Sequence, residues 1–406
     1  MNATPASVSK VKNRILTLVS VILFWHLSAF TTAPTPPVKD QSIQLALLLD
    51  TSNSMDGLID QAKSQLWKVV NELAAAKCAD GKKPNIKIAL YEYGNDNLSS
   101  QEGYIRQVSG LTDDLDLISE KLFSLSTNGG NEFCGHVINS SLRQLTWSTS
   151  PNDLKMIFIA GNEPFTQGGI AYRTSCGLAR EKGVVVNTIF CGPFDEGMRT
   201  NWKDGADITN GSYMSIEQNR KTVYVPSPYD ERISALNEKL NETYVYYGTS
   251  GESKKEMQAT QDNNAECYGQ ANKVERAVSK SSHAYRNSSW DLVDASKENE
   301  EIIAKAKDDE LPVAMKGMSV PQREAYVKMK AEERSKIQSE IQTLNKKRQE
   351  YIATNTPKEE GDTSLDAAMI KAVREKAKQK NLSFCRCAGR PSSRTRRSAR
   401  CRCGPR

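Results

Sequence analysis

The strongest constraint on the fold is a nearly unbroken apolar segment, Ile43 to Leu49, that ends at Asp50. A run of this kind is typical of a strand that is buried on both faces of a parallel sheet. Hydroxyl, amide and carboxylate side chains follow it at once, in the order Asp50-Thr51-Ser52-Asn53-Ser54. The chain is therefore expected to begin its fold with a central strand that ends in a polar turn.

Strand and helix patterns alternate after this segment. Strands are expected at 86–93, 104–108, 155–160, 184–191 and 212–216, and helices at 55–76, 113–125, 133–146, 168–182 and 194–204. This alternation predicts an α/β fold with a doubly wound, mostly parallel sheet that helices cover on both faces. We assign residues 43–220 to this domain and residues 221–384 to an α-helical region that follows it.

Oxygen-bearing side chains gather where three segments of the predicted domain end. They are Asp50 to Ser54, Thr127 to Glu132, and Gly161 to Pro164. Ligands of doubly wound sheets bind at the carboxyl ends of the strands, so these segments are expected to meet. Carboxylate, hydroxyl and carbonyl oxygens suit a hard divalent cation such as Mg²⁺. The sequence therefore predicts a cation site at this end of the sheet.

The spacing Asp50-x-Ser52-x-Ser54 after a buried strand resembles the metal-ion-dependent adhesion site of von Willebrand factor type A domains. The order of elements over residues 43–216 agrees with that family. The resemblance implies a binding module in which these three residues bind Mg²⁺ or another divalent cation. It also implies that an acidic group of a protein partner can complete the coordination.

The two remaining ligands of the resembled site do not transfer directly. The family has a Thr in the second loop, which points to Thr127, although Asn131 or Glu132 is an alternative. The family has an Asp in the third loop, where Asn162 is the nearest match, with Glu163 beside it. The predicted metal ligands are thus Asp50, Ser52, Ser54, Thr127 and Asn162. The competing interpretation is a degenerate site whose polar residues only cap the following helix.

The formal net charge of +6 is concentrated at the two ends of the chain. Lys10, Lys12 and Arg14 give +3 before residue 34, and eight arginines without an acid give +8 after residue 384, which leaves −5 for residues 34–384. A mildly acidic body argues against nucleic acid as a partner. With only three histidines in the chain, a His-rich metal centre is not expected.

The basic residues near the amino terminus precede an apolar run from Ile15 to Phe30. This pattern predicts an export signal, either cleaved or kept as an anchor, over residues 1–33, followed by a Pro-rich linker over 34–42. We expect a periplasmic, secreted or membrane-anchored protein that contacts a membrane only through this segment. Residues 385–406, rich in Arg and Cys, are expected to be a disordered tail.

The nine cysteines and the helical region leave alternatives open. Export permits a Cys134–Cys191 disulfide, with Cys176 as a competing partner, and the alternative is buried free thiols. Residues 320–352 are predicted helical, and Ile337, Ile341 and Leu344 have a 4,3 spacing that Tyr351 continues, which makes about two heptads and is too short to assign a coiled coil. These helices are expected either to pack on the first domain or to form an extended partner-binding helix.

Together these patterns predict an exported or envelope-associated protein that mediates divalent-cation-assisted protein–protein interaction or adhesion. One alternative is a structural envelope scaffold with a degenerate metal site. A metal-dependent hydrolase and a cytoplasmic subunit of an ATP-driven assembly are further alternatives. No catalytic residue and no organic cofactor are predicted, because the site end of the sheet offers few plausible bases.

Overall fold

The structure is a computed structural model that describes residues 40–220, 224–355 and 364–384. The chain divides into two units, residues 1–40 and 41–406, and all described residues except Asp40 belong to the second. The predicted signal or anchor and the Arg-rich tail lie outside the described residues. No helix in the described part is both long enough and apolar enough to cross a membrane.

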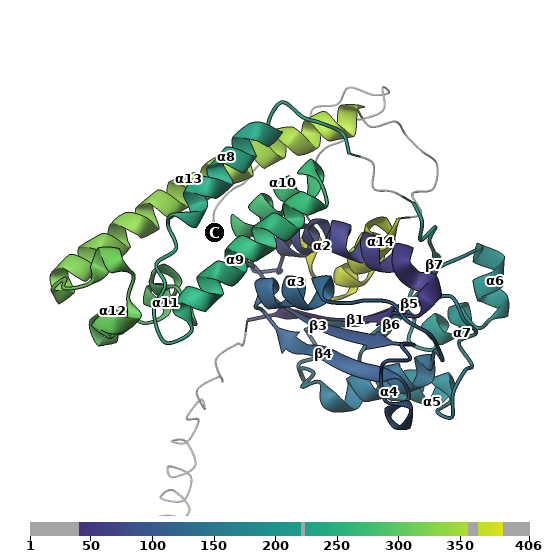
Figure 1. Cartoon of the computed structure of the whole chain (residues 1–406). Coiled ribbons are helices and arrows are strands. Elements are labelled where there is room, and N and C mark those ends of the chain that lie inside the picture. The colour runs from purple at the N-terminus through teal and green to yellow at the C-terminus, as the bar shows by residue number, and fades with distance from the viewer. Residues whose placement is uncertain (1–39, 221–223, 356–363, 385–406) are drawn as a thin grey trace, which may run out of the picture. The chain divides into compact units, whose positions relative to one another are not determined.

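A six-stranded sheet forms the centre of the second unit, in the order β4-β3-β1-β5-β6-β7 (Figure 1). All neighbouring strands are parallel except β3 and β4, which are antiparallel. This is the predicted doubly wound, mostly parallel sheet. Its strands are β1 (Ser42–Asp50), β3 (Asn85–Tyr93), β4 (Ile105–Thr112), β5 (Leu154–Gly161), β6 (Val185–Phe190) and β7 (Tyr213–Ser215).

Strand β1 lies between β3 and β5 and sends alternate side chains into two separate cores. Leu45 and Leu47 join the core on one face, whereas Ala46 and Leu48 join the core on the other. The side-chain period of two explains why the segment is apolar at almost every position. The prediction of a central strand buried on both faces is confirmed.

Helices cover both faces of the sheet (Figure 1). One face is covered by α2 (Asp56–Ala75), α3 (Leu115–Phe123) and α14 (Leu365–Gln379). The other is covered by α4 (Cys134–Gln144), α5 (Tyr172–Glu181) and α7 (Trp202–Asp207). The predicted helix 194–204 is in fact two, because α6 (Phe194–Arg199) ends before Asn201, which has a positive φ of 70°. Strand β4 also extends further than predicted.

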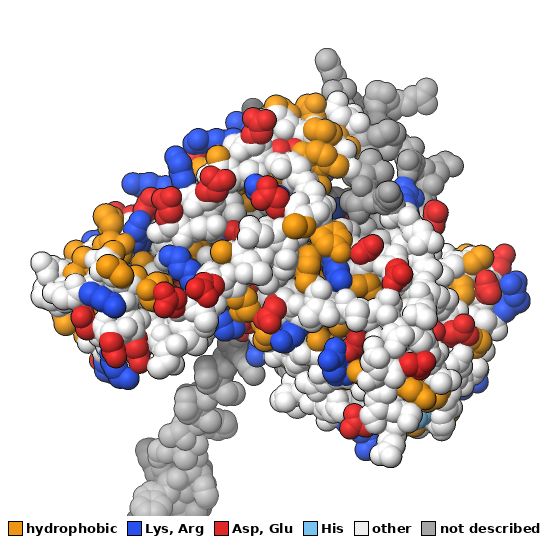
Figure 2. All heavy atoms as spheres, viewed as in Figure 1, with side chains coloured by type: hydrophobic (Ala, Val, Ile, Leu, Met, Phe, Trp, Pro, Cys, Tyr) orange, Lys and Arg blue, Asp and Glu red, His pale blue; other side chains and the backbone are white. Residues whose placement is uncertain are grey.

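The helical region packs against α2 and α3 rather than standing apart. It consists of α8 (Asp230–Asn241), α9 (Gly251–Cys267), α10 (Gln270–Lys280), α11 (Leu292–Glu298), α12 (Glu301–Lys305) and α13 (Val320–Asn355). Helix α10 packs on α2, α9 packs on α3, and α13 packs on α8 and α10. Acidic and basic side chains lie side by side over α8 and α13 on the face seen in Figure 2.

The last helix returns to the sheet. Helix α14 packs on α2, β5 and β6, and Ser383–Phe384 (β8) pairs with Ala76–Lys77 (β2) at the end of α2. The helices α8 to α13 therefore lie, in sequence, between the last strand of the sheet and a helix that covers one of its faces. The buried side chains Met369, Ala372 and Val373 complete the core on that face.

Candidate metal centre

Asp50 is the last residue of β1 and is completely buried. Its Oδ1 accepts a hydrogen bond from the backbone N–H of Ser52 at 2.8 Å, so the loop turns around the carboxylate. Its Oδ2 has no hydrogen-bond partner among the described atoms. A buried carboxylate oxygen without a partner is costly, and a cation bound beside it would offset this cost.

Three more of the predicted ligands lie beside each other. The hydroxyl oxygens of Ser52 and Ser54 are 3.2 Å apart, and Asn162 Nδ2 donates to Ser54 Oγ at 3.2 Å. Asn162 comes directly after β5, next to β1 in the sheet. Its Oδ1 is buried and has no donor in the described part of the chain. The structure thus brings the first and third loops together at the end of the sheet.

The second loop is held against the first by its backbone, but Thr127 points elsewhere. Asn128 N donates to Thr51 O at 2.9 Å, and Asn53 N donates to Gly129 O at 2.6 Å. The hydroxyl of Thr127 donates to Asp56 Oδ1, at the start of α2. Among the contacts of the described residues, Thr127 therefore pairs with Asp56 and not with Asp50 or the two serines.

Glu132 is the side chain that the second loop presents to Asp50. It is 3% exposed, and its Oε2 has no partner among the described atoms. A Cβ built on Gly94 would lie 2.8 Å from both Asp50 Oδ1 and Glu132 Cγ, which places the two carboxyl groups on either side of this glycine. Sequence analysis weighed Glu132 only as an alternative, and its burial next to Asp50 could not be read from local spacing.

Burial is the main reason that both carboxyl groups resist ionisation. Desolvation raises the pKa of Asp50 well above its ordinary value, and the neighbouring Glu132 raises it further. Desolvation also raises the pKa of Glu132, while the neighbouring side chains of Asp50 and Ser52 oppose the shift. Two carboxyl groups in such a position favour a bound positive charge, because a cation would stabilise both in the ionised form.

The third loop lacks the carboxylate that the resemblance places there. Gly161, the last residue of β5, lies beside Asp50 because Ala160 pairs with Leu49. A Cβ at Gly161 would lie 3.0 Å from Asp50 Oδ2 and 2.4 Å from Tyr93 Oη, so no larger side chain fits without movement. Glu163 is near, but its carboxylate accepts a hydrogen bond from Gln167 Nε2 at 3.1 Å.

The cysteines near the site are free thiols in the structure. Cys134 and Cys191 are buried and unbonded, so the disulfide considered from the sequence is not formed. Burial raises the pKa of both thiols well above the ordinary value, which keeps them protonated. The nearby His136 accepts a hydrogen bond at Nε2 from Ile170 N at 2.8 Å, so this nitrogen is not free to act as a base.

The unpartnered atoms of the site fit a hard cation. Asp50 Oδ2, Glu132 Oε2 and Asn162 Oδ1 are all buried oxygen acceptors without donors among the described atoms. Oxygen ligands with few carboxylates are typical of Mg²⁺, which keeps several waters. No group of three or more His, Cys, Asp and Glu side chains in the described residues could hold a metal ion. The donors present therefore differ from those of a structural zinc centre.

The structure combines three features: this sheet order, helices on both faces, and the Asp50-x-Ser52-x-Ser54 turn at the end of β1. Residues 42–216 have a von Willebrand factor type A-like fold. Helix α14, much later in the sequence, covers part of the sheet of this type A-like domain. The predicted fold class is confirmed.

Several solved structures are similar to part of the chain. The protein BatB from Bacteroides thetaiotaomicron is 18% identical, with a TM-score of 0.34, over 43% of this chain and 90% of that one. The SpRpn10 VWA domain is 14% identical, with a TM-score of 0.33, over 43% and 88%. Proximal thread matrix protein 1 from the mussel byssus, with zinc in its MIDAS motif, is 12% identical, with a TM-score of 0.32, over 43% and 41%.

Comparison by sequence gives no independent support for the fold assignment. No family model matches the chain, and no curated protein matches it.

Proposed function

We propose that the chain is an exported or envelope-associated binding module that holds a divalent cation at the end of β1 and uses it to capture a protein partner. The observation that carries the proposal is the buried pair of carboxyl groups of Asp50 and Glu132. One oxygen of each, Asp50 Oδ2 and Glu132 Oε2, lacks a hydrogen-bond partner among the described atoms. Asp50, Ser52, Ser54, Glu132 and Asn162 would hold the cation. When bound, a cation supplies positive charge and open positions for oxygen ligands from a partner.

The charge of the site bears on the kind of partner group. Asp50 and Glu132, when both are ionised, balance the two charges of a divalent cation. A partner oxygen is then bound by coordination more than by net attraction, so an acidic partner group would gain less than at a site with one carboxylate. The binding role is preferred to a hydrolytic one because His136 Nε2 is engaged by Ile170 and both neighbouring thiols are held protonated.

Two observations favour the alternative of an envelope scaffold with a degenerate metal site. The third loop places Gly161 beside Asp50 and offers the neutral amide of Asn162 where the resembled family has an aspartate, and the Thr127 hydroxyl donates to Asp56. The two proposals differ in whether a cation stabilises the folded chain. A ligand that binds only the folded state at one hundred times its Kd adds about 2.7 kcal/mol to the free energy of unfolding.

The test is thermal unfolding of the purified chain in EDTA and then with increasing MgCl₂, MnCl₂ or CaCl₂. We expect Tm to rise with at least one cation, and the rise to be lost in Asp50→Asn and in Glu132→Gln. Asp309→Asn, an exposed acid far along the chain in the helical region, is the matched control and should keep the rise. A wild-type chain that is insensitive to all three cations would favour the scaffold.

Partner capture is tested with the same variants as bait. An envelope extract is passed over the immobilised wild-type chain with the stabilising cation and then with EDTA. We expect one protein to be retained with the cation, released by EDTA, and absent from the Asp50→Asn bait. A protein that remains bound under all three conditions would show that capture does not use the cation site.

A further inference from the structure

The outer edge of the sheet at β4 carries a row of backbone groups that the fold does not use. Strand β4 is the last strand on its side of the sheet and pairs only with β3 among the described strands (Figure 1). An edge strand leaves N–H and C=O groups with which another extended chain can pair, and proteins usually protect such an edge with bulges, charges or a covering segment. The protection of β4 therefore decides whether its edge can bind a partner.

The protection is confined to the second half of β4. The register against β3 shifts at two places, both opposite residues 107–112. Bulges of this kind bend an edge and disrupt the ladder that a partner would extend. Residues 105–107, in contrast, pair one to one with residues 91–93. The charged side chain in this regular half, Arg106, pairs with the buried Glu92.

The hydrogen-bond pattern shows which backbone groups of the regular half point outward. Gly94 N donates to Tyr104 O at 3.0 Å, and Ile105 lies opposite Tyr93. In an antiparallel pair, residues that exchange hydrogen bonds with the partner strand alternate with residues that do not. Ile105 is therefore a residue of the second kind, and so is Gln107, two positions later. Both direct their N–H and C=O groups away from β3.

A cavity of about 410 Å³ lies along this half of the edge. Its lining joins residues 105–107 to Ser140 and Gln144 of α4, which are four residues apart and so lie on one face of that helix. Residues 98–102, in the loop before β4, contribute to one end of it. Pockets that bind ligands usually measure roughly 300–1,000 Å³. The outward backbone groups thus lie next to a groove between a strand and a helix.

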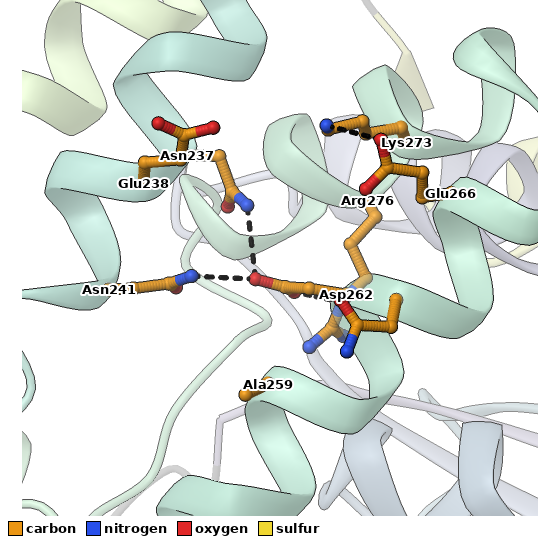
Figure 3. Close-up of a pocket in the computed structure, with 9 residues that line it drawn as sticks. Asn237, Glu238, Asn241, Ala259, Asp262, Glu266, Lys273 and Arg276 are labelled. Carbon is orange, nitrogen blue, oxygen red and sulfur yellow. Dashed lines mark hydrogen bonds and ion pairs between the residues drawn. The ribbon is translucent and has the colours of Figure 1, made fainter.

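The cavity between α8, α9 and α10 is of a different kind (Figure 3). It measures about 170 Å³ and opens over Asp262. That carboxylate accepts hydrogen bonds from Asn237 (3.0 Å) and Asn241 (2.8 Å) and pairs with Arg276 (2.7 Å). Its central charge is thus satisfied within the chain, whereas the groove beside β4 offers backbone groups without a partner strand among the described residues.

The groove favours one extended segment over a second copy of the chain. Outward N–H and C=O groups two residues apart match the backbone of an added strand, which is the β-augmentation mode of recognition. Helix α4 and residues 98–102 border the edge, so a single strand fits where a whole sheet with its helices would meet them. Hydroxyl and amide groups of Ser99, Ser140 and Gln144 line the groove, and Glu102 is its one charge without an ion-pair partner among the described residues.

We propose that β4 binds an extended, non-acidic segment of a partner protein as an added strand in the groove between β4 and α4. Main-chain hydrogen bonds with Ile105 and Gln107 supply the affinity, and the side chains of the segment that face α4 are hydroxyls or amides. The three regular residues of β4 span about 10 Å at a strand rise of about 3.3 Å, which sets the length of the paired part. This interaction does not use the cation site.

The probe is a phage-displayed library of random heptapeptides, selected against the immobilised full chain in EDTA so that no cation contributes. We expect enriched peptides to carry Ser, Thr, Asn or Gln at alternate positions and few acids. The peptide with the lowest Kd in calorimetry is then N-methylated at one position at a time. We expect affinity to fall by about tenfold at every second position, because each such methyl group removes a donor to β4.

Matched variants of the chain locate the bound peptide. Gln107→Pro removes one outward N–H, and a strand edge whose N–H faces solvent tolerates proline. We expect it to weaken binding by about tenfold. Gln107→Ala removes the same side chain but keeps the N–H, and it should retain the affinity. Ser140→Tyr, which fills the groove from α4, should also weaken binding, and thermal unfolding confirms that each variant folds.

Four outcomes would overturn the proposal. They are no enrichment in EDTA, equal binding by Gln107→Pro and Gln107→Ala, N-methylation effects without a period of two, and a wild-type dimer in sedimentation that Gln107→Pro makes monomeric. The last outcome would show that the edge binds a second copy. A chain that binds the peptides but gains no stability from any cation would keep this interaction and lose the proposed cation-dependent function.

Discussion

At the scale of single residues, Gly94 decides how closely the two site carboxylates approach. Its φ is +79°, a conformation that favours glycine, and it follows β3 directly. The space where a Cβ would stand is bounded by Asp50 Oδ1 and Glu132 Cγ. A residue with a side chain at this position would be strained and would also push the carboxyl groups apart.

Gly94→Ala is therefore expected to lower the free energy of unfolding by more than the strain of its left-handed backbone conformation alone would. The control is Gly81→Ala, because Gly81 has a φ of +82° and nothing lies within 4 Å of the place that its Cβ would take. We expect Gly81→Ala to lower the free energy of unfolding by about 1–2 kcal/mol and to leave cation binding unchanged. Gly94→Ala should cost more and should lose the cation-dependent rise in Tm, as measured by urea and thermal unfolding. Equal effects of the two variants would contradict the role given to Gly94.

The sequence predicted those site residues that are close together in the chain. Asp50, Ser52 and Ser54 share one turn, so their spacing alone indicates a site. Glu132 was weighed but not chosen, because its meeting with Asp50 depends on how the second loop packs. Thr127 was chosen by its residue type, yet the tertiary fold places Asp56 within reach of its hydroxyl. Residue type and spacing therefore indicate the first loop and Asn162 of the candidate site, but not which side chain the second loop presents to Asp50.

At the scale of elements, a buried ionic cluster joins α9 and α10 to α3. Asp262 of α9 pairs with Arg276 and Lys280 of α10, and Arg276 pairs with Asp116 of α3. The two cations hold the pKa of Asp262 far below its ordinary value, although burial alone would raise it. Sequence patterns predicted a helical segment here but not its break at Gly269, whose φ is +100°. They also did not predict which charges would be buried.

Asp262→Asn is expected to lower stability in a pH-dependent way. Because the folded pKa of Asp262 is depressed, its stabilisation is complete above the ordinary pKa of about 3.8 and is lost as the pH falls below it. At pH 7 the substitution leaves the buried Lys280 without a carboxylate partner in the described part of the chain and leaves Arg276 with Asp116 alone, at a cost of about 3–5 kcal/mol. The difference between wild type and variant should be constant above about pH 5 and should shrink as the pH falls below about 4, as measured by urea unfolding. A difference that stays constant with pH would contradict this account.

At the scale of the whole molecule, the type A-like domain depends on a helix that is remote in sequence. Gln61 and Gln65 of α2 accept hydrogen bonds from the backbone N–H groups of Leu365 (3.0 Å) and Asp366 (2.8 Å). These side chains satisfy donors that the first turn of a helix leaves free. The sequence predicted a helical region over residues 221–384 but not where its last helix packs, since an amphipathic pattern shows that a face is buried and not what buries it.

Ala372→Asp should destabilise the sheet as well as α14. Ala372 is fully buried in the core between α14 and the sheet, so a carboxylate there has no hydrogen-bonding partner to replace water. We expect a loss of more than about 3 kcal/mol in the free energy of unfolding. Lys371→Asp, one residue earlier and exposed, is the matched control and should change stability by less than about 1 kcal/mol. Near-UV circular dichroism during urea unfolding reports whether the core of the sheet is lost together with the helix.

The return of α14 and β8 to α2 also sets the order in which the chain can fold as it is made. The helix α2 and the strands β1 to β7 leave the ribosome long before the residues that cover β5 and β6. Until Leu382 has been synthesised, apolar side chains on one face of the sheet stay exposed. A chain in that state is prone to aggregate and is a substrate for chaperones. Completion of this core therefore waits until α14 and β8 have been synthesised, about 170 residues after the last strand of the sheet.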